Sequence, residues 1–252
     1  MTVPSPQNAH DILVEPITNA ADMLPAFLCA ANGFGHQTHD AMWMAMSPGW
    51  DTPSGALSCS ERLIKQWRNA TYNSAGDPNT VFVKATLPDP NDSGKRVIAG
   101  FAIWVQWSFV EGMGDRPTTD ADDVMDLEQL YPGDEEAQRF VRQGWVALTK
   151  QRVEAVREKA TTDSPATFSL DLCAVDPKFQ RRGIASKLVE WGLNEARRRG
   201  GLESTTEGSQ MGRLVYEKLG YKPIREGSFE GMDAEFVSRM PSNMFMRTGV
   251  LS

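Results

Sequence analysis

The sequence is poor in cysteine and has no long hydrophobic run. Its three cysteines, Cys29, Cys59 and Cys173, are an odd number with no C-x-x-C pair, so we expect neither a disulfide framework nor a thiolate zinc site. No apolar run approaches the roughly 18 residues of a membrane span, and Met1 to Asp11 lack the apolar core of a signal peptide. These absences predict a cytoplasmic chain with no membrane partner.

Positive charge is also scarce, since 26 Lys and Arg oppose 33 Asp and Glu for a net charge of -7. Broad nucleic-acid binding needs a basic face, so we expect no nucleic-acid partner, and the balance mildly favours cationic small substrates. The hydrophobic share of 40% and the charged share of 23% are those of ordinary globular chains. We therefore expect one domain over residues 1–252 with a sizeable core.

Hydrophobic periodicity predicts an α+β order of elements. A turn-rich cluster at 88–94 joins two strands that we expect to pair as an antiparallel hairpin, and 34–54 reads as a structured loop with short helical turns. The expected strands are 12–17, 81–87, 97–107, 167–175 and 202–206, and the expected helices are 20–31, 56–69, 135–159 and 186–199.

Residues 111–163 form a long insertion that is acidic at its start and helical from about 135 to 159. Two interpretations stay open. The insertion is either a surface segment with solvated charge or a lid over a substrate pocket, because long insertions beside a core are often functional.

The strand 167–175 leads into a loop and a helix whose chemistry suits an anion. Gly183 allows a positive φ and a close backbone approach, and the amides of the first helical turn have no intrahelical partner. Arg181 and Arg182 add positive charge. Pro177 cannot donate to a ladder, so it should end or splay the strand pairing. These features predict a pocket for a long molecule with a phosphate at one end.

This segment resembles the acetyl-CoA signature of the GNAT superfamily of N-acetyltransferases. Residues 175–188 carry the Q-R-R-G-I-A run, in which Gln180, Gly183 and Ala185 fill the family's Gln/Arg-x-x-Gly-x-Gly/Ala pattern. Residues 214–221 resemble its second landmark, a helix ending Leu-Tyr-x-x-x-Gly-Phe. The resemblance implies an α+β GNAT fold, with a central mixed, mostly antiparallel twisted sheet flanked by helices and splayed at the acetyl-CoA strand.

The resemblance also implies acetyl-CoA as cosubstrate and direct attack of an amine on its thioester. Tyr216 matches the family's general acid, which protonates the leaving thiolate, and Ser209 stands where the family often has a pantetheine-binding Asn. The implied donor contacts are the backbone of Leu172, Cys173, Ala174 and Val175 for the pantetheine and the polarising amide, and Gln180, Arg181, Arg182, Gly183, Ile184, Ala185 and Ser186 for the pyrophosphate.

Asp171 is the candidate base. Strand alternation should place Ser169, Asp171 and Cys173 on one face, where some relatives carry a Glu at the position of Ser169. Asp171 either takes the proton, directly or through water, or only anchors the substrate ammonium. Glu207, near the end of the next strand, is a weaker candidate.

Other reactive residues receive ordinary interpretations. Cys173 in an apolar strand reads as a core residue rather than a nucleophile. His36 and His39 lack the spacing of a helical zinc pair and an evident third ligand, so we expect no metal. Trp43 and Trp50 belong to a region that usually shapes the acceptor site in the superfamily.

The leading functional hypothesis is N-acetylation of a small-molecule primary amine by a monomer or homodimer. The alternatives are a protein acetyltransferase, acting on an N-terminus or a lysine, and a catalytically silent CoA-binding module. A closed acceptor pocket would favour the small molecule, and an open groove would favour a peptide.

Overall fold

The computed structural model describes residues 11–89 and 91–251. In these ranges one seven-stranded sheet has the order β1-β2-β3-β4-β5-β7-β6, and only the β4–β5 pair is parallel. Residues 1–10, where the sequence shows no apolar core of a signal peptide, lie outside the described residues, as does Pro90 of the predicted turn. The strands are β1 Leu13–Pro16, β2 Thr80–Asp89, β3 Asp92–Ser108, β4 Ala166–Val175, β5 Thr205–Ser209, β6 Lys222–Glu226 and β7 Asn243–Arg247.

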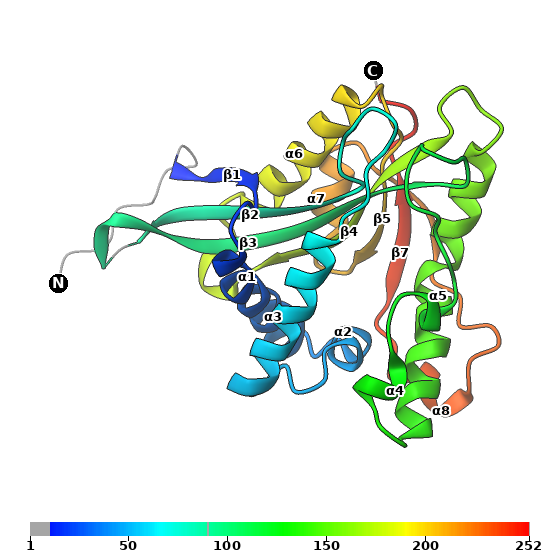
Figure 1. Ribbon diagram of the computed structural model, residues 1–252, viewed down its shortest axis with the longest axis horizontal. Helices are drawn as coiled ribbons and strands as arrows, with labels where there is room; N and C mark the ends of the chain where they lie inside the picture. The colour runs from blue at the N-terminus through cyan, green and yellow to red at the C-terminus, as the bar shows by residue number, and fades with distance from the viewer. Residues whose placement is uncertain (1–10, 90, 252) are drawn as a thin grey trace.

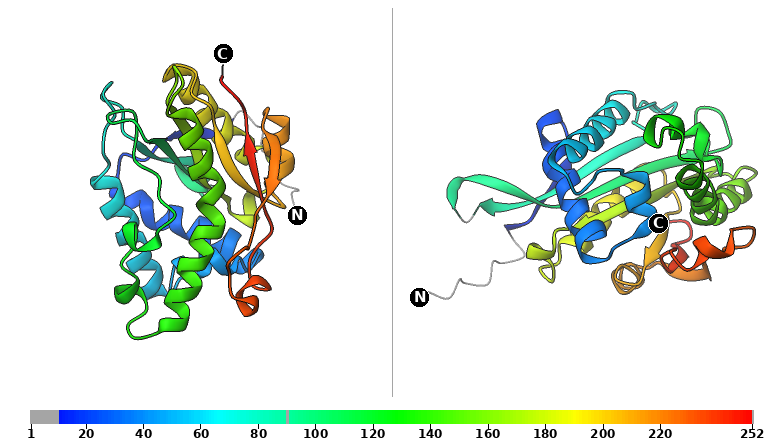
Figure 2. Two further views of the ribbon diagram at one scale, coloured as in Figure 1. Left: turned by 90° about the vertical axis from the view of Figure 1, so that its right-hand side faces the viewer. Right: turned by 90° about the horizontal axis from the view of Figure 1, so that it is seen from below.

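Helices cover both faces of this sheet (Figures 1 and 2). One face carries α6 and α7, and the opposite face carries α1, α3 and α5, with α2 and α4 beside α5. The helices are α1 Met23–Ala30, α2 Ala41–Met46, α3 Pro53–Arg68, α4 Leu127–Leu130, α5 Glu135–Lys159, α6 Ile184–Arg198, α7 Arg213–Lys218 and α8 Ala234–Val237. A π-helix spans Ala31–Gln37, and 3-10 turns span Ala20–Asp22, Ala121–Asp123 and Pro177–Phe179.

The predicted elements are confirmed with small shifts of their bounds. The hairpin of β2 and β3 pairs antiparallel from Thr80↔Val105 to Asp89↔Asp92. The strand expected at 202–206 begins later, at Thr205, after an isolated parallel bridge between Thr167 and Glu203. The loop expected at 34–54 contains more regular structure than its Gly and Pro content indicates, because α1 continues directly into the π-helix.

β4 lies at the centre of the sheet and has two irregularities. Its pairing with β5 consists of Leu170↔Thr206, so the two strands splay beyond Leu170, as predicted. Its pairing with β3 shifts between Ile103 and Trp104, where Ile103 faces Leu172 and Trp104 faces Leu170. Asp171 is therefore the extra residue of a β-bulge.

The helix of the insertion is a core element. Ten residues of α5 are buried, among them Phe140, Val141 and Val156, and the helix packs against β3, β4, β5 and β7. The interpretation of 111–163 as a merely solvated surface segment is therefore wrong for α5, although the acidic stretch before it, such as Asp122 and Asp123, is exposed.

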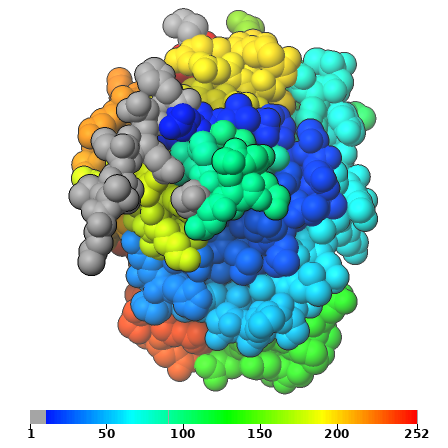
Figure 3. Space-filling model, turned by 90° about the vertical axis from the view of Figure 1, so that its left-hand side faces the viewer, coloured from blue at the N-terminus to red at the C-terminus, as the bar shows by residue number. Residues whose placement is uncertain are grey.

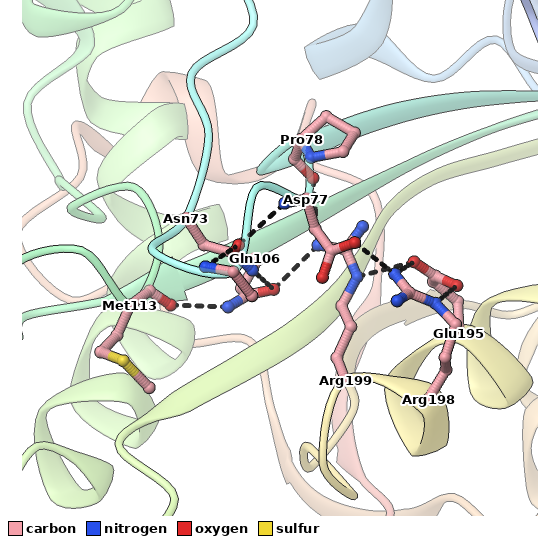
Figure 4. A network of polar contacts seen from close by, with 9 residues as sticks. Asn73, Asp77, Pro78, Gln106, Met113, Glu195, Arg198 and Arg199 are labelled. Carbon is pink, nitrogen blue, oxygen red and sulfur yellow. Dashed lines mark hydrogen bonds and ion pairs between the residues drawn. The ribbon is translucent and has the colours of Figure 1, made fainter.

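A polar network fastens the far end of α6 to the loop before β2 (Figure 4). Arg199 donates to the Pro78 carbonyl at 3.0 Å and to Gln106 at 2.8 Å, and Arg198 pairs with Asp77 at 2.6 Å. Glu195 binds both arginines. The network fixes the C-terminal end of α6 on the sheet.

None of the helices built from residues 11–89 and 91–251 is long and apolar enough to cross a bilayer.

Candidate active site

The splay opens the edge of β4 that faces β5. Beyond Leu170, β4 is paired along β3, from Leu172↔Ile103 to Val175↔Gly100, while its other edge has left β5. Backbone amides and carbonyls on that edge then lack a strand partner and suit an extended ligand with amide groups of its own. Leu172, Cys173, Ala174 and Val175, the predicted pantetheine residues, all lie in this part of the strand.

The loop after β4 forms a concave turn of backbone amides. Arg181 (φ 63°) and Gly183 (φ 87°) are both left-handed, a conformation that turns successive amides toward an anion. No side chain caps the N-terminus of α6, whereas Asp40, Thr52 and Asp134 cap α2, α3 and α5. The amides of the first turn, from Ile184, Ala185 and Ser186, are thus left for a ligand.

The space above this turn is open. A Cβ built on Gly183 would meet no atom within 4 Å, so the cradle has room for a phosphate group. Arg181 and Arg182 are exposed beside it, and Figure 3 shows this segment in yellow-green at the surface on the side where the β2–β3 hairpin ends. The predicted pyrophosphate residues are therefore together, and they fit the group that the resemblance implies.

Two polar contacts tie the loop to the π-helix. Asn32 donates to Asp176 at 2.6 Å, and the amides of Gln37 and Gln180 bond each other at 2.7 Å and 3.1 Å. Gln180 also donates to the Val175 carbonyl at 3.1 Å. Gln180, taken from the motif as a donor contact, is thus a brace that joins the end of β4 to the loop.

Tyr216 lies on the α6 and α7 face, buried in the core cluster that includes Cys173. Burial raises the pKa of its phenol well above the ordinary value, and Cys173, Tyr221 and Glu207 raise it further. A phenol in this setting stays protonated through neutral pH and is available as a proton donor. Ser209 accepts a bond from the Gly212 amide at 3.3 Å just before α7, so its hydroxyl has a structural partner.

The predicted common face of Ser169, Asp171 and Cys173 is wrong for Cys173. Phe168 and Leu170 before the bulge, and Cys173 and Val175 after it, all pack on the α6 side. Leu172 and Ala174 pack on the α1 side. The extra residue at the bulge inverts the alternation, which a strict period of two does not anticipate.

Asp171 points toward α5, where sequence reasoning found no partner for it. Arg152 on α5 donates to Asp171 Oδ1 at 2.5 Å and to Glu207 Oε1 at 3.0 Å, and its Nη2 pairs with Glu207 Oε2. Burial raises the pKa of Glu207, the Arg152 charge opposes that rise, and Asp171 adds to it. Arg152 gave no sequence signal beyond being a charged residue in a helix with apolar neighbours.

A small cavity reaches Glu207 from the α5 side. Its volume is about 10 Å³, room for about one water molecule. Its walls are mostly apolar and come from α5, from the segment after β6 and from β7. The lining residues are Ala147, Leu148, Gln151, Glu207, Gly227, Phe229, Met240, Pro241, Asn243 and Phe245.

The surroundings of the remaining candidate residues, Cys173 and His36, indicate structural roles. Burial raises the pKa of the Cys173 thiol to about 12, so it is a neutral thiol and a poor nucleophile near pH 7. His36 packs edge-on against Trp50, which packs against Trp43. Within the part of the chain that the structure describes, no three His, Cys, Asp or Glu side chains gather as metal ligands would.

Comparisons with known proteins agree with this geometry. Residues 141–223 match the family model described as an acetyltransferase (GNAT) domain. A comparison with curated proteins found no match. The matched region holds most of α5, the splayed strand, the loop, α6 and Tyr216, which are the elements of the candidate site.

Solved structures share the fold at low sequence identity. Arylalkylamine N-acetyltransferase 2 from Aedes aegypti is 18% identical with a TM-score of 0.56, covering 96% of this chain and 100% of its own. The Drosophila melanogaster polyamine N-acetyltransferase is 13% identical with a TM-score of 0.57, covering 94% and 98%. A protein described as histone acetyltransferase HPA2 and related acetyltransferase, from Corynebacterium glutamicum, is 15% identical with a TM-score of 0.50, covering 96% and 98%.

The splayed strand, the uncapped helix and the family match define an acyltransferase of the class that uses acetyl-CoA. The family match over residues 141–223 confirms the resemblance seen in the sequence, and the solved structures confirm the predicted fold.

Proposed function

We propose that this chain transfers an acetyl group from acetyl-CoA to a primary amine of a small molecule by direct attack on the thioester. The observation that supports this most is that a candidate proton donor and two candidate proton acceptors lie on opposite faces of the sheet, where β4 and β5 diverge. Tyr216 is buried on the α6 and α7 face, and the carboxylates of Asp171 and Glu207 meet Arg152 from α5 on the other.

The donor lies across the splay in this proposal. The uncapped amides of Ile184, Ala185 and Ser186 hold the pyrophosphate, with Arg181 and Arg182 adding positive charge. The open edge of β4 from Leu172 to Val175 aligns the pantetheine, and one of its amides polarises the thioester carbonyl.

The acceptor amine approaches from the α5 face. Its ammonium loses a proton to a carboxylate, and the freed lone pair attacks the thioester carbon. On the opposite face Tyr216 gives its proton to the leaving thiolate, which its raised pKa permits because the phenol is protonated at neutral pH. Asp171 is the carboxylate indicated by the sequence. In this proposal it either accepts the proton or anchors the ammonium.

The helical cover over the α5 side of Glu207 favours a small molecule over a peptide. The cavity at Glu207 is narrow, and α5 together with the segment around α8 covers it, held by an Asp233 amide bond to Gln143 at 2.9 Å. This supports the lid interpretation of the insertion for α5. The Aedes and Drosophila proteins named above, an arylalkylamine and a polyamine acetyltransferase, share this fold.

A thiol-release assay tests the proposal. Purified chain and acetyl-CoA are combined with a panel of primary amines and with lysine-containing and free-N-terminal peptides. We expect turnover with at least one small amine, and kcat in Tyr216→Phe to fall about 100-fold, the range of general acid catalysis.

The outcomes separate the alternatives. Turnover confined to peptides would replace the small-molecule proposal with protein acetylation. Binding of acetyl-CoA without turnover on any amine would leave a silent CoA-binding module. Full activity of Tyr216→Phe with every active amine would remove the general-acid role.

A further inference from the structure

Arg152 joins the two strands at the point where they diverge. It is 3% exposed, and it bonds Glu207 of β5 through two nitrogens and Asp171 of β4 through a third. Three ionisable side chains from α5, β4 and β5 thus form one unit, here called the triad. Its guanidinium spans the splay on the acceptor face.

The triad carries one negative charge more than it can neutralise. Two carboxylates oppose one guanidinium, and the side chains of Glu207 and Asp171 are only 8% and 29% exposed. Uncompensated charge is costly when water is excluded. The bidentate bond commits Glu207 to Arg152, so the surplus charge lies toward Asp171, which is held through one oxygen at the bulge.

We propose that Arg152 is a positioning residue that fixes Asp171 and Glu207 as a single proton-accepting unit, whose surplus charge binds the substrate ammonium. The proposal rests on the proposed function. It assigns the base to the pair of carboxylates rather than to one residue, as expected for strongly coupled groups, and it gives the insertion helix a part in the chemistry.

The proton balance is as follows. The ammonium gives one proton to the carboxylates, and the freed lone pair forms the C–N bond as the C–S bond breaks. The thiolate takes the phenolic proton of Tyr216, and the second proton of the attacking nitrogen restores the phenol. The carboxylates release their proton to solvent with the products, which are an amide, free coenzyme A and one proton.

Glu207 is the member of the triad whose titration should shape the acidic limb of the pH profile. Burial raises the pKa of Glu207, while Cys173 and Tyr216, its neighbours across the sheet, have pKa values raised to about 12 and well above 10. Glu207 is the one titratable residue among the described residues that line the cavity. Several charged groups along α5 and beside the cavity have ion-pair partners outside the triad: Arg142 pairs with Asp122, Glu158 with Arg247, and Glu226 with Arg213. Lys150 and Glu154 of α5 are exposed.

The decisive experiment is the pH profile of kcat/KM for Arg152→Met with an active amine. Without the guanidinium, two partly buried carboxylates repel each other, so we expect the acidic limb to move to higher pH by about one unit or more. The matched control is Arg247→Met, which removes an arginine bonded to Glu203 at 2.8 Å and 3.0 Å. It should lower stability and leave the limb in place.

Glu207→Gln provides a second test that keeps the side-chain shape. It brings the net charge of the triad to zero, so KM for the amine should rise about tenfold, and the limb should move to lower pH because the carboxyl group whose pKa burial raises has been removed. Calorimetry with coenzyme A should give wild-type affinity, because the loop is separate from the triad. If Arg152→Met fails to fold, this variant decides alone.

Two results would overturn the inference alone: an acidic limb that stays in place in Arg152→Met, or an unchanged KM and limb in Glu207→Gln, while wild type acetylates an amine. Equal limb shifts in Arg152→Met and Arg247→Met would also overturn it, since they would reflect lost stability. Absence of wild-type turnover with every amine would instead overturn the proposed function and this inference together.

Discussion

At the scale of single residues, backbone conformation prepares the donor site. Gly183 has a φ of 87°, and a Cβ built on it would meet no atom within 4 Å. Steric contacts within the protein therefore do not by themselves require glycine at this position. The left-handed conformation and the room for a phosphate are the two reasons for glycine here. The neighbouring Arg181 accepts the same conformation at some cost in strain.

Gly183→Val should therefore weaken coenzyme A binding by about tenfold or more, because the side chain fills the cradle and disfavours the left-handed turn. Isothermal calorimetry measures the affinity. Gly76→Val is the matched control, since Gly76 also has a positive φ, at 83°, and an open Cβ position, but it lies beyond the other end of α6. Equal affinity losses in the two variants would show that strain alone, and no phosphate cradle, explains the effect.

Candidate roles can be assigned from the sequence where a local pattern carries them. Gly183 and Tyr216 stand in short motifs whose chemistry follows from the strand–loop–helix around them. The bulge at Asp171 was not predictable, because alternation continues through it in the sequence and only the pairing with β3 shows the shift. Arg152 was missed because its partners come from two strands, and long-range pairing leaves no local signal.

At the scale of elements, α6 is held at its N-terminal end by the loop and along its length by close packing on the sheet. Gly192 is the point of closest approach, since a Cβ there would stand 2.0 Å from the Trp104 ring. Trp104 in turn stacks on Phe168 at 5.3 Å. The position of the amides proposed to bind phosphate thus depends on how closely this helix can approach β3.

Gly192→Ala should lower the free energy of unfolding by about 1–3 kcal/mol, because the methyl group overpacks a full core. This loss should exceed the gain of up to about 1 kcal/mol that alanine brings to a helix interior. Urea unfolding followed by tryptophan fluorescence measures the change. The control is Gly94→Ala, where the nearest atom is 3.7 Å from the added Cβ. A stabilised Gly192→Ala protein would contradict the packing argument.

The elements themselves followed from periodicity, and their roles did not. The helix expected at 135–159 is α5 with the same bounds, because capping by Asp134 and the apolar spacing act locally. Its burial against four strands depends on the whole sheet, so the sequence left the choice between surface segment and lid open.

At the scale of the whole molecule, ion pairs join segments that are far apart in the sequence. Arg247 of β7 binds Glu203 before β5 and Glu158 at the end of α5. Arg198 and Arg199 bind Glu195 and reach the loop before β2. These pairs frame the splay at its closed end, where β4 and β5 are still bonded, so they hold the two strands from which the site diverges.

The same pairs should make stability depend on pH. Burial raises the pKa of Glu203, but the bonds from Arg247 and the charge of Lys159 outweigh it and hold the pKa below the ordinary value. Hydrogen bonds from Arg198 and Arg199 likewise lower the pKa of Glu195, against the effect of burial. Between the folded and unfolded pKa values the unfolded chain binds more protons, so this stabilisation is complete above about pH 4.3 and is lost as the pH falls through the folded values.

Arg247→Met should consequently cost about 3 kcal/mol of unfolding free energy at pH 7, the lower end for breaking a buried pair, because Arg247 is partly exposed. The difference from wild type should shrink on acidification, since protonated Glu203 no longer needs a counter-ion. Urea unfolding of both proteins at pH 7, 5 and 3.5 measures it. A difference that stays constant over this range would mean that the Glu203 pKa is not lowered in the folded chain.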